Sequence, residues 1–223
     1  MNPAVLAPPP VERRAPRVPS LPSPPSDGGY GRPPAPAPNV PPMDNARLGL
    51  LFFLGAETML FASFIAGFLV VRVGSAVWPP PLQPRLPLLV TGLNTLCLLV
   101  SSATMRSVTQ ALRRGDRAAL ARGLGLTAAL GTVFLAVQGF EWVRLIHFGL
   151  LVSSGAYGGT FYTLIGLHGA HVLGALTWLS AVALGVRSGR LGPHRRTPVA
   201  LCAMYWHYVV AVWPILYVLV YLY

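Results

Sequence analysis

The sequence predicts an all-α integral membrane protein, a bundle of five transmembrane helices. Hydrophobic residues make up 53% of the 223 residues and charged residues only 10%, whereas about a quarter of a soluble domain is charged. The apolar residues also gather in five blocks, each long enough to cross a ~30 Å hydrocarbon core as a helix. The mean hydropathy of +0.56 agrees with this class.

The first 46 residues differ in composition from the rest of the chain. They hold fifteen of the 23 prolines and too few apolar residues to offset the entropy lost on ordering. They also lack the apolar core of a signal peptide. We therefore expect a Pro-rich, disordered cytoplasmic tail over 1–46 and a transmembrane domain over 47–223.

The five apolar blocks define the expected membrane spans. The fourth is the longest and is expected to tilt or to extend beyond the bilayer. A rigid Pro-rich connection follows the first block, and a polar, basic connection follows the second. The spans are expected at 48–71, 86–105, 123–146, 158–186 and 199–222.

Arginine placement predicts the orientation of the bundle. All seventeen cationic residues are arginine, and fourteen of them lie in the tail, at Arg47 directly after it, and in the connections near 106–122 and 187–198. Only Arg72, Arg85 and Arg144 lie on the other side. The positive-inside rule then places the N-terminus in the cytoplasm and the C-terminus outside. The net charge of +11 has this origin, so it does not indicate a nucleic-acid partner.

Two acidic residues fall inside the apolar blocks, where an ionised group costs at least about 2.5–3.5 kcal/mol. Glu57 lies about ten residues into the first span, roughly 15 Å deep and near the midplane. It is either a functional carboxyl or a protonated acid bonded to a neighbouring helix. Glu141 lies near the outer end of the third span, where an ion pair with Arg144 at i+3 is an alternative to a functional role.

Three histidines also lie inside apolar blocks. His168 and His171 are separated by three residues, which places both imidazoles on one helix face. Such a pair could chelate a metal. A haem would need a second helix, with His207 as the candidate, but an intramembrane histidine more commonly forms an interhelical hydrogen bond. Trp206 and His207 lie too deep to be interfacial aromatic residues.

A stripe of small residues runs beside His171 in the fourth block. Its members recur every four residues and would let another helix approach closely. Plain packing is the simplest interpretation of this stripe, which consists of Gly166, Ala170 and Gly174.

Five segments, one in each block and in the right order, resemble subunit III of the haem–copper oxidases, most closely that of cytochrome c oxidase. Together they cover about 48–223, and it is their combination and order that are specific. The segments are 51–61 (LFFLGAETMLF), 86–95 (LPLLVTGLNT), 138–142 (QGFEW), 160–172 (TFYTLIGLHGAHV) and 205–213 (YWHYVVAVW).

The resemblance implies a helical subunit without a catalytic residue, metal or redox centre of its own. Haem and copper would belong to the catalytic subunit I, with subunit II and a small subunit IV as further partners. In the family, the glutamate that matches Glu57 reacts with carbodiimide, and the subunit supports proton entry, protects against turnover inactivation and holds phospholipids in a cleft. The other polar residues, Glu141, His168, His171, Trp206 and His207, would form an intramembrane network or lipid contacts.

The chain departs from the family pattern twice. Larger members have two additional N-terminal helices that form one arm of the lipid cleft, whereas this chain has the Pro-rich tail and resembles the short, five-helix form. Where the family commonly has Trp-His-Phe-Val-Asp, this chain has WHYVV at 206–210 and so lacks an acid.

The function expected is that of subunit III of a respiratory cytochrome c oxidase in a bacterial plasma membrane. Two alternatives stay open. One is the equivalent subunit of a quinol oxidase, or of a relative associated with nitric oxide reduction. The other is a free-standing intramembrane haem b protein that uses His171 and His207. A proton-coupled transporter is disfavoured, because the spans show no inverted repeat.

Overall fold

The computed structural model describes residues 44–78, 80, 87–191 and 196–223, and all regular secondary structure within them is helical. Each of the five long helices is apolar enough to cross a membrane, which confirms the predicted fold class. The tail predicted to be disordered lies outside the described residues except for its last three. The helices are α1 (Asn45–Val73), α2 (Leu88–Arg114), α3 (Arg117–His147), α4 (Ala156–Arg187) and α5 (Arg196–Tyr217), with a π-helical end η1 (Val218–Leu222).

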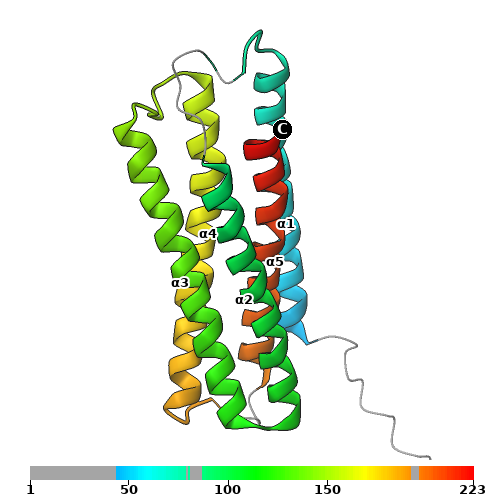
Figure 1. Cartoon of the computed structure of the whole chain (residues 1–223). Coiled ribbons are helices and arrows are strands. Elements are labelled where there is room, and N and C mark those ends of the chain that lie inside the picture. Colours follow the sequence, from blue (N-terminus) through cyan, green and yellow to red (C-terminus); the bar gives the residue numbers. More distant parts are fainter. Residues whose placement is uncertain (1–43, 79, 81–86, 192–195) are drawn as a thin grey trace, which may run out of the picture. The chain divides into compact units, whose positions relative to one another are not determined.

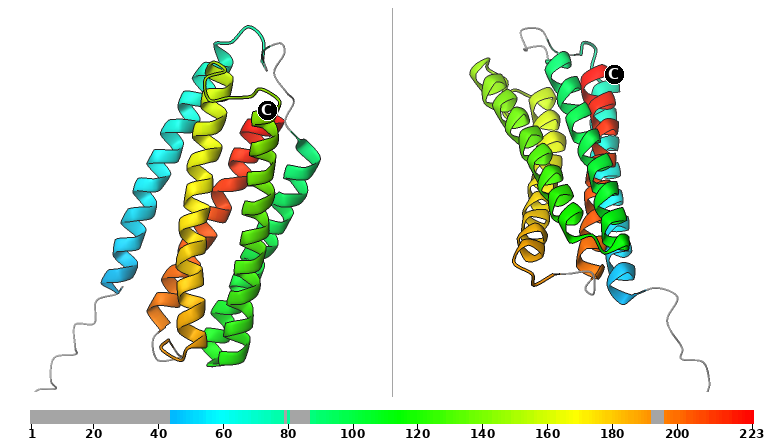
Figure 2. Two further views of the ribbon diagram at one scale, coloured as in Figure 1. Left: turned by 90° about the vertical axis from the view of Figure 1, so that its left-hand side faces the viewer. Right: turned by 60° about the horizontal axis from the view of Figure 1, so that its bottom comes forward.

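Four of the helices form a closed ring. Helix α2 packs against α3, α3 against α4, α4 against α5, and α5 returns to α2. Helix α1 lies outside this ring and packs mainly against α4 and α5, as the views in Figures 1 and 2 show. The first helix in the sequence is therefore an addition to a bundle that the other four close among themselves.

The inside of the ring is filled by large side chains, while the outside remains apolar. Trp206, Trp213 and Phe134 are among the largest fully buried side chains. On the outer surface, Met59 is 74% exposed and Leu89 is 84% exposed. An apolar surface of this kind is costly in water and suits a hydrocarbon environment.

Helices α2 and α3 extend well past the apolar blocks that predicted the membrane spans. The basic segment between those blocks is rich in Arg and Ala and also contains Leu, all strong helix formers, so the backbone stays helical beyond the hydrocarbon region. Gly115 ends α2 with a left-handed φ of 75°, a conformation open to glycine at little cost. The turn that joins the two helices is therefore only 115–116.

Asp116 begins α3 by accepting a hydrogen bond from the Ala119 amide at 2.9 Å. We expect Asp116→Ala to lower the free energy of unfolding by about 1 kcal/mol, because an N-terminal amide of the helix loses its acceptor. Thermal unfolding in detergent would measure the change. The matched control is Asp44→Ala at the start of α1, where the corresponding bond from Ala46 is 3.5 Å long. An equal loss in both variants would contradict the capping interpretation.

Candidate functional site

The site begins with the buried stripe of α1. Leu54, Phe61 and Phe68 are the buried residues of this helix, and their seven-residue spacing defines one face that packs on the ring. Glu57 lies three residues after Leu54 and four before Phe61, so it shares that face. The same periodicity that buries the apolar side chains of α1 therefore directs this carboxyl towards the bundle.

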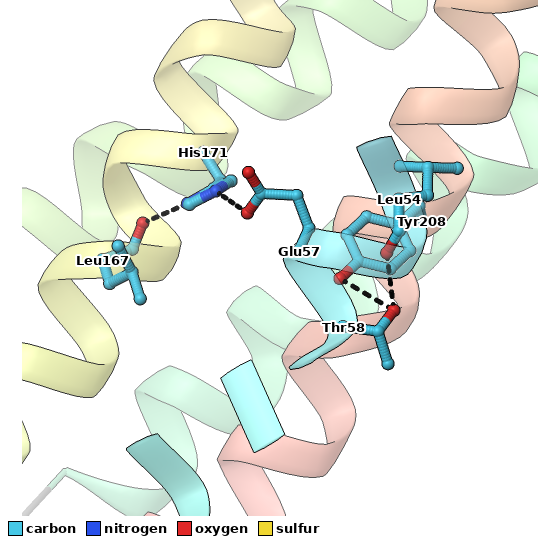
Figure 3. Close-up of polar contacts among 6 residues, drawn as sticks. All are labelled: Leu54, Glu57, Thr58, Leu167, His171 and Tyr208. Carbon is cyan, nitrogen blue, oxygen red and sulfur yellow. Dashed lines mark hydrogen bonds and ion pairs between the residues drawn. The ribbon is translucent and has the colours of Figure 1, made fainter. Parts of the chain in front are cut away.

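Glu57 meets His171 of α4 at the centre of the two helices. Oε2 of Glu57 lies 2.6 Å from Nε2 of His171, and the two side chains are only 14% and 13% exposed. The other ring nitrogen, Nδ1, lies 2.7 Å from the carbonyl oxygen of Leu167, as Figure 3 shows. Both ring nitrogens of His171 are thus engaged.

These two contacts determine how many protons the Glu57–His171 pair holds. A carbonyl oxygen only accepts, so Nδ1 of His171 must carry a hydrogen. The 2.6 Å contact at Nε2 then needs one further proton, on the imidazole facing a carboxylate or on the carboxyl facing a neutral imidazole. Either arrangement leaves the pair without net charge. Sharing one proton is what makes an acid tolerable within an apolar span.

Helix α5 completes the surroundings of Glu57 on its other side. The hydroxyl of Thr58 donates to the carbonyl of Leu54 at 2.7 Å and lies 3.3 Å from the hydroxyl of Tyr208 (Figure 3). Phe61 covers the imidazole of His171, with ring centroids 5.0 Å apart. Polar contacts therefore hold α1 to both of the ring helices on which it packs.

His168 lies three residues before His171 and has a different environment. It is 1% exposed and stacks on Trp213 with ring centroids 4.9 Å apart. Neither of its ring nitrogens has a hydrogen-bond partner within the described part of the chain. The structure thus engages His171 with Glu57 and leaves the nitrogens of its helical neighbour unpaired.

Glu141 is buried on α3, and its carboxylate lies near the guanidinium of Arg144, three residues later on the same helix. Its Oε1 lies 3.7 Å from Nη1 of Arg144, whose side chain is 53% exposed. One turn earlier, the amide of Gln138 donates to the hydroxyl of Tyr221 at 3.2 Å. Glu141 therefore lies near the C-terminal end of α3 and is not joined to Glu57 by any of these contacts.

Trp206 and His207 join α5 to α2. The indole nitrogen of Trp206 donates to the hydroxyl of Ser101 at 3.2 Å, and Nδ1 of His207 lies 2.7 Å from the hydroxyl of Ser102. The sequence identified the two α5 residues but not their serine partners. A small hydroxyl residue in an apolar helix becomes informative only when the facing helix is known.

In the small-residue stripe of α4, Gly166 packs near Trp142 of α3, since an added Cβ would lie 3.5 Å from its ring. Ala170 and Gly174 are exposed, and a Cβ atom added to Gly174 would meet nothing within 4 Å. A closer approach occurs at Gly131 of α3, where an added Cβ would lie 2.4 Å from the ring of Trp206. Sequence analysis missed this position because its partner is a large aromatic residue rather than a second small one.

The described ranges hold no cluster of metal-ligating side chains. No group of three or more His, Cys, Asp or Glu residues there could hold an ion. Both ring nitrogens of His171 are already engaged, so in this arrangement that imidazole has none left to ligate a haem iron. The polar groups of the site are suited to holding helices and a proton.

Comparison with known proteins shows a match between this sequence and one protein family. The sequence model of the family described as cytochrome c oxidase subunit III matches residues 39–223. This range contains all five helices and every residue of the site.

Individual relatives agree with that match. The chain is 36% identical over 182 residues to cytochrome c oxidase subunit 3 of Synechocystis sp., covering 80% of this chain and 76% of the relative. It is 34% identical over 179 residues to the protein of that name from Bacillus subtilis, covering 80% and 86%. It is also 34% identical over 176 residues to the one from Thermostichus vulcanus, covering 78% and 86%.

Proposed function

Because the chain belongs to the cytochrome c oxidase subunit III family, we propose that it acts as the accessory subunit III of a respiratory haem–copper oxidase in a bacterial plasma membrane. It stabilises the catalytic subunit I and supports proton entry into it, within a complex that also holds subunit II and a small subunit IV. Electron transfer and oxygen reduction take place in the partner subunits, where the haem and copper are bound. The names of the relatives favour cytochrome c over a quinol as the electron donor of the complex.

The Glu57–His171 contact is the observation that carries the proton-linked part of this function. It holds one shared proton near the middle of α1 and α4, with both side chains slightly exposed at the helix surface. Loss of that proton would leave a carboxylate against the lone pair of Nε2 at 2.6 Å, or an imidazole without its bond. While the proton is shared, the contact holds α1 against α4.

The outer surface supports the partnership and the membrane location. Its apolar side chains, among them Phe52 at 73% exposure, offer area both to a partner subunit and to phospholipids. The start of α1, the turn after α2 and the end of α4 share one end of the bundle (Figure 1). This is the arginine-rich end, so we place it, with the N-terminus, in the cytoplasm and Tyr223 outside.

The test is to isolate the tagged chain from its native membranes, as wild type and as Glu57→Gln. Wild type should elute with subunit I and with its haem absorbance. The variant should elute with the same haem bands, because a glutamine amide can still donate to Nε2 of His171. Its labelling by a hydrophobic carbodiimide should fall to background, and its activity should be lost earlier during turnover, since the shared proton is gone.

Glu141→Gln serves as the matched control, because it removes the other buried acid without touching His171. It should leave carbodiimide labelling and turnover lifetime at the wild-type level. Elution of the wild-type chain without haem absorbance would refute the partnership. Loss of the haem bands in Glu57→Gln alone would show that this residue supports the redox centres, contrary to the proposal.

A further inference from the structure

The last turn of α1 meets aromatic rings from two other segments at the end of the bundle opposite the arginine-rich end, called here the far end. The guanidinium carbon of Arg72 lies 4.5 Å from the ring centroid of Tyr223 and 5.6 Å from that of Trp78. Tyr223 directly follows η1, and Trp78 lies in the connection after α1 (Figure 1). Both distances are within the ~6 Å over which the face of an aromatic ring attracts a cation.

Trp78 extends this contact to α4. Its ring meets that of Tyr157, in the first turn of α4, edge to face at a centroid distance of 4.9 Å. It also meets the ring of Phe68, one turn before Arg72, at 5.8 Å. Near-perpendicular rings at these separations attract each other, and both Tyr157 and Phe68 are buried. Trp78 therefore joins the last turn of α1 to a buried residue of the ring.

Between this contact and the middle of the bundle, α1 and α4 stand apart. A groove of about 300 Å³ lies between them, lined by residues from Ser63 to Val71 on α1 and from Gly159 to Leu164 on α4. Along α1, the Glu57–His171 contact comes before the groove, and Arg72 comes directly after it. The far half of α1 is thus attached to α4 mainly at the two ends of the groove.

The aromatic rings are the partners that the structure gives to the guanidinium of Arg72. Within the described ranges, this side chain takes part in no ion pair and no hydrogen bond. Arg72 is half-buried, and a cation that is partly removed from water gains more from an aromatic face than one in open solvent. The position of the guanidinium therefore depends on the rings of Tyr223 and Trp78.

We propose that Arg72, Trp78 and Tyr223 form a latch that holds the far end of α1 to the bundle, with the Glu57–His171 contact as its pivot. While the cation–π contacts are made, α1 is held on both sides of the groove. When they are lost, the last turns of α1 move away from α4 and the groove widens, while the other half of α1 stays in place. The proposal concerns this chain alone and does not depend on the partner subunits.

The experiment measures distances between pairs of nitroxide labels by pulsed electron paramagnetic resonance. The full-length protein is purified in detergent, with both native cysteines replaced by alanine. The far pair is attached at Val70 and Leu173, and the near pair at Phe52 and Leu184, all of them exposed positions on α1 and α4. In the otherwise unchanged protein, each pair should give one narrow distance distribution.

Arg72→Met removes the charge and keeps the length of the side chain. The far pair should then show a second, longer distance, and the ratio of latched to released protein should fall on the order of tenfold, as expected for the loss of the cation–π contacts. The near pair should keep its distribution. An unchanged far pair would overturn the proposal. So would an equal shift in both pairs, because α1 would then be loosened along its whole length.

Further variants separate a cation–π contact from apolar packing and from a hydrogen bond. Tyr223→Phe keeps the ring face and should leave the far pair unchanged, whereas Tyr223→Leu keeps only apolar volume and should behave like Arg72→Met. Arg144→Met is the matched control, because it removes the cation that lies 5.7 Å from the ring of Phe148 without touching α1. It should change neither pair. A shift in Tyr223→Phe as large as that in Tyr223→Leu would assign the contact to the hydroxyl and overturn the latch.

Discussion

Gly131→Ala is expected to destabilise the bundle by about 1–3 kcal/mol, although it adds a single methyl group. The added Cβ would lie 2.4 Å and 3.0 Å from two ring carbons of Trp206, and 3.5 Å from Leu176. Trp206 is 1% exposed, and its indole nitrogen is bonded to Ser101. The ring cannot withdraw without breaking that bond and displacing its neighbours, so the cost falls on the contact between α3 and α5. Thermal unfolding of the purified chain in detergent would measure it.

Gly139→Ala is the matched control on the same helix. An added Cβ there meets nothing within 4 Å, and alanine is a better helix former than glycine by roughly 1 kcal/mol. This variant should therefore be unchanged or slightly more stable. Combining Gly131→Ala with Trp206→Phe, which shortens the ring, should recover part of the loss. If both glycine variants lost equal stability, steric contact with Trp206 would not be the cause.

Separating Glu57 from His171 is expected to have the second large effect. Glu57→Leu leaves Nε2 of His171 unpaired, and His171→Leu leaves the carboxyl unpaired. Each change should cost about 1–3 kcal/mol, the cost of an unsatisfied buried polar group. The double variant leaves no unpaired polar group, so its loss of stability should be clearly smaller than the sum of the losses in the two single variants. The free energies of unfolding of the wild type, the two single variants and the double variant would give the coupling energy between Glu57 and His171.

The pair of Glu141 and Arg144 provides the comparison. Its atoms are 3.7 Å apart and its arginine is 53% exposed, so its coupling should be only about 0–1 kcal/mol. Strict additivity in the Glu57–His171 cycle would mean that the 2.6 Å contact contributes nothing to holding α1. Limited proteolysis of the Glu57 and His171 variants provides a second measurement. If the contact is weakened, α1 should become susceptible to cleavage before the ring of α2 to α5 does.

Some features of this structure follow from the sequence, and the reasons are local. Apolar blocks predict five helices because length and hydropathy decide membrane insertion. They do not predict where the helices end, because Arg, Ala and Leu continue α2 and α3 outside the bilayer until Gly115 interrupts them. Hydropathy indicates which segments favour lipid over water, whereas the residue at which a helix ends is decided by backbone conformation.

The candidate site was only partly predictable. Glu57 and His171 could each be singled out as expensive polar residues within apolar spans, and the stripe of α1 orients Glu57 inward. Their pairing joins residues 114 positions apart, and it depends on which ring helices α1 meets. The unpaired state of His168 was equally hidden, since a spacing of three residues places two imidazoles on one face without saying what opposes each.

The position of α1 outside the ring has a consequence for biogenesis. The ribosome delivers α1 to the membrane first, but the two helices on which it packs, α4 and α5, are synthesised last. Glu57 therefore spends the interval in lipid without His171, at the cost that an unpaired acid carries there. The ring cannot close until α5 arrives, so the earliest helix to insert is among the last to dock. Any chaperone that assists this protein would do most by shielding α1 during that wait.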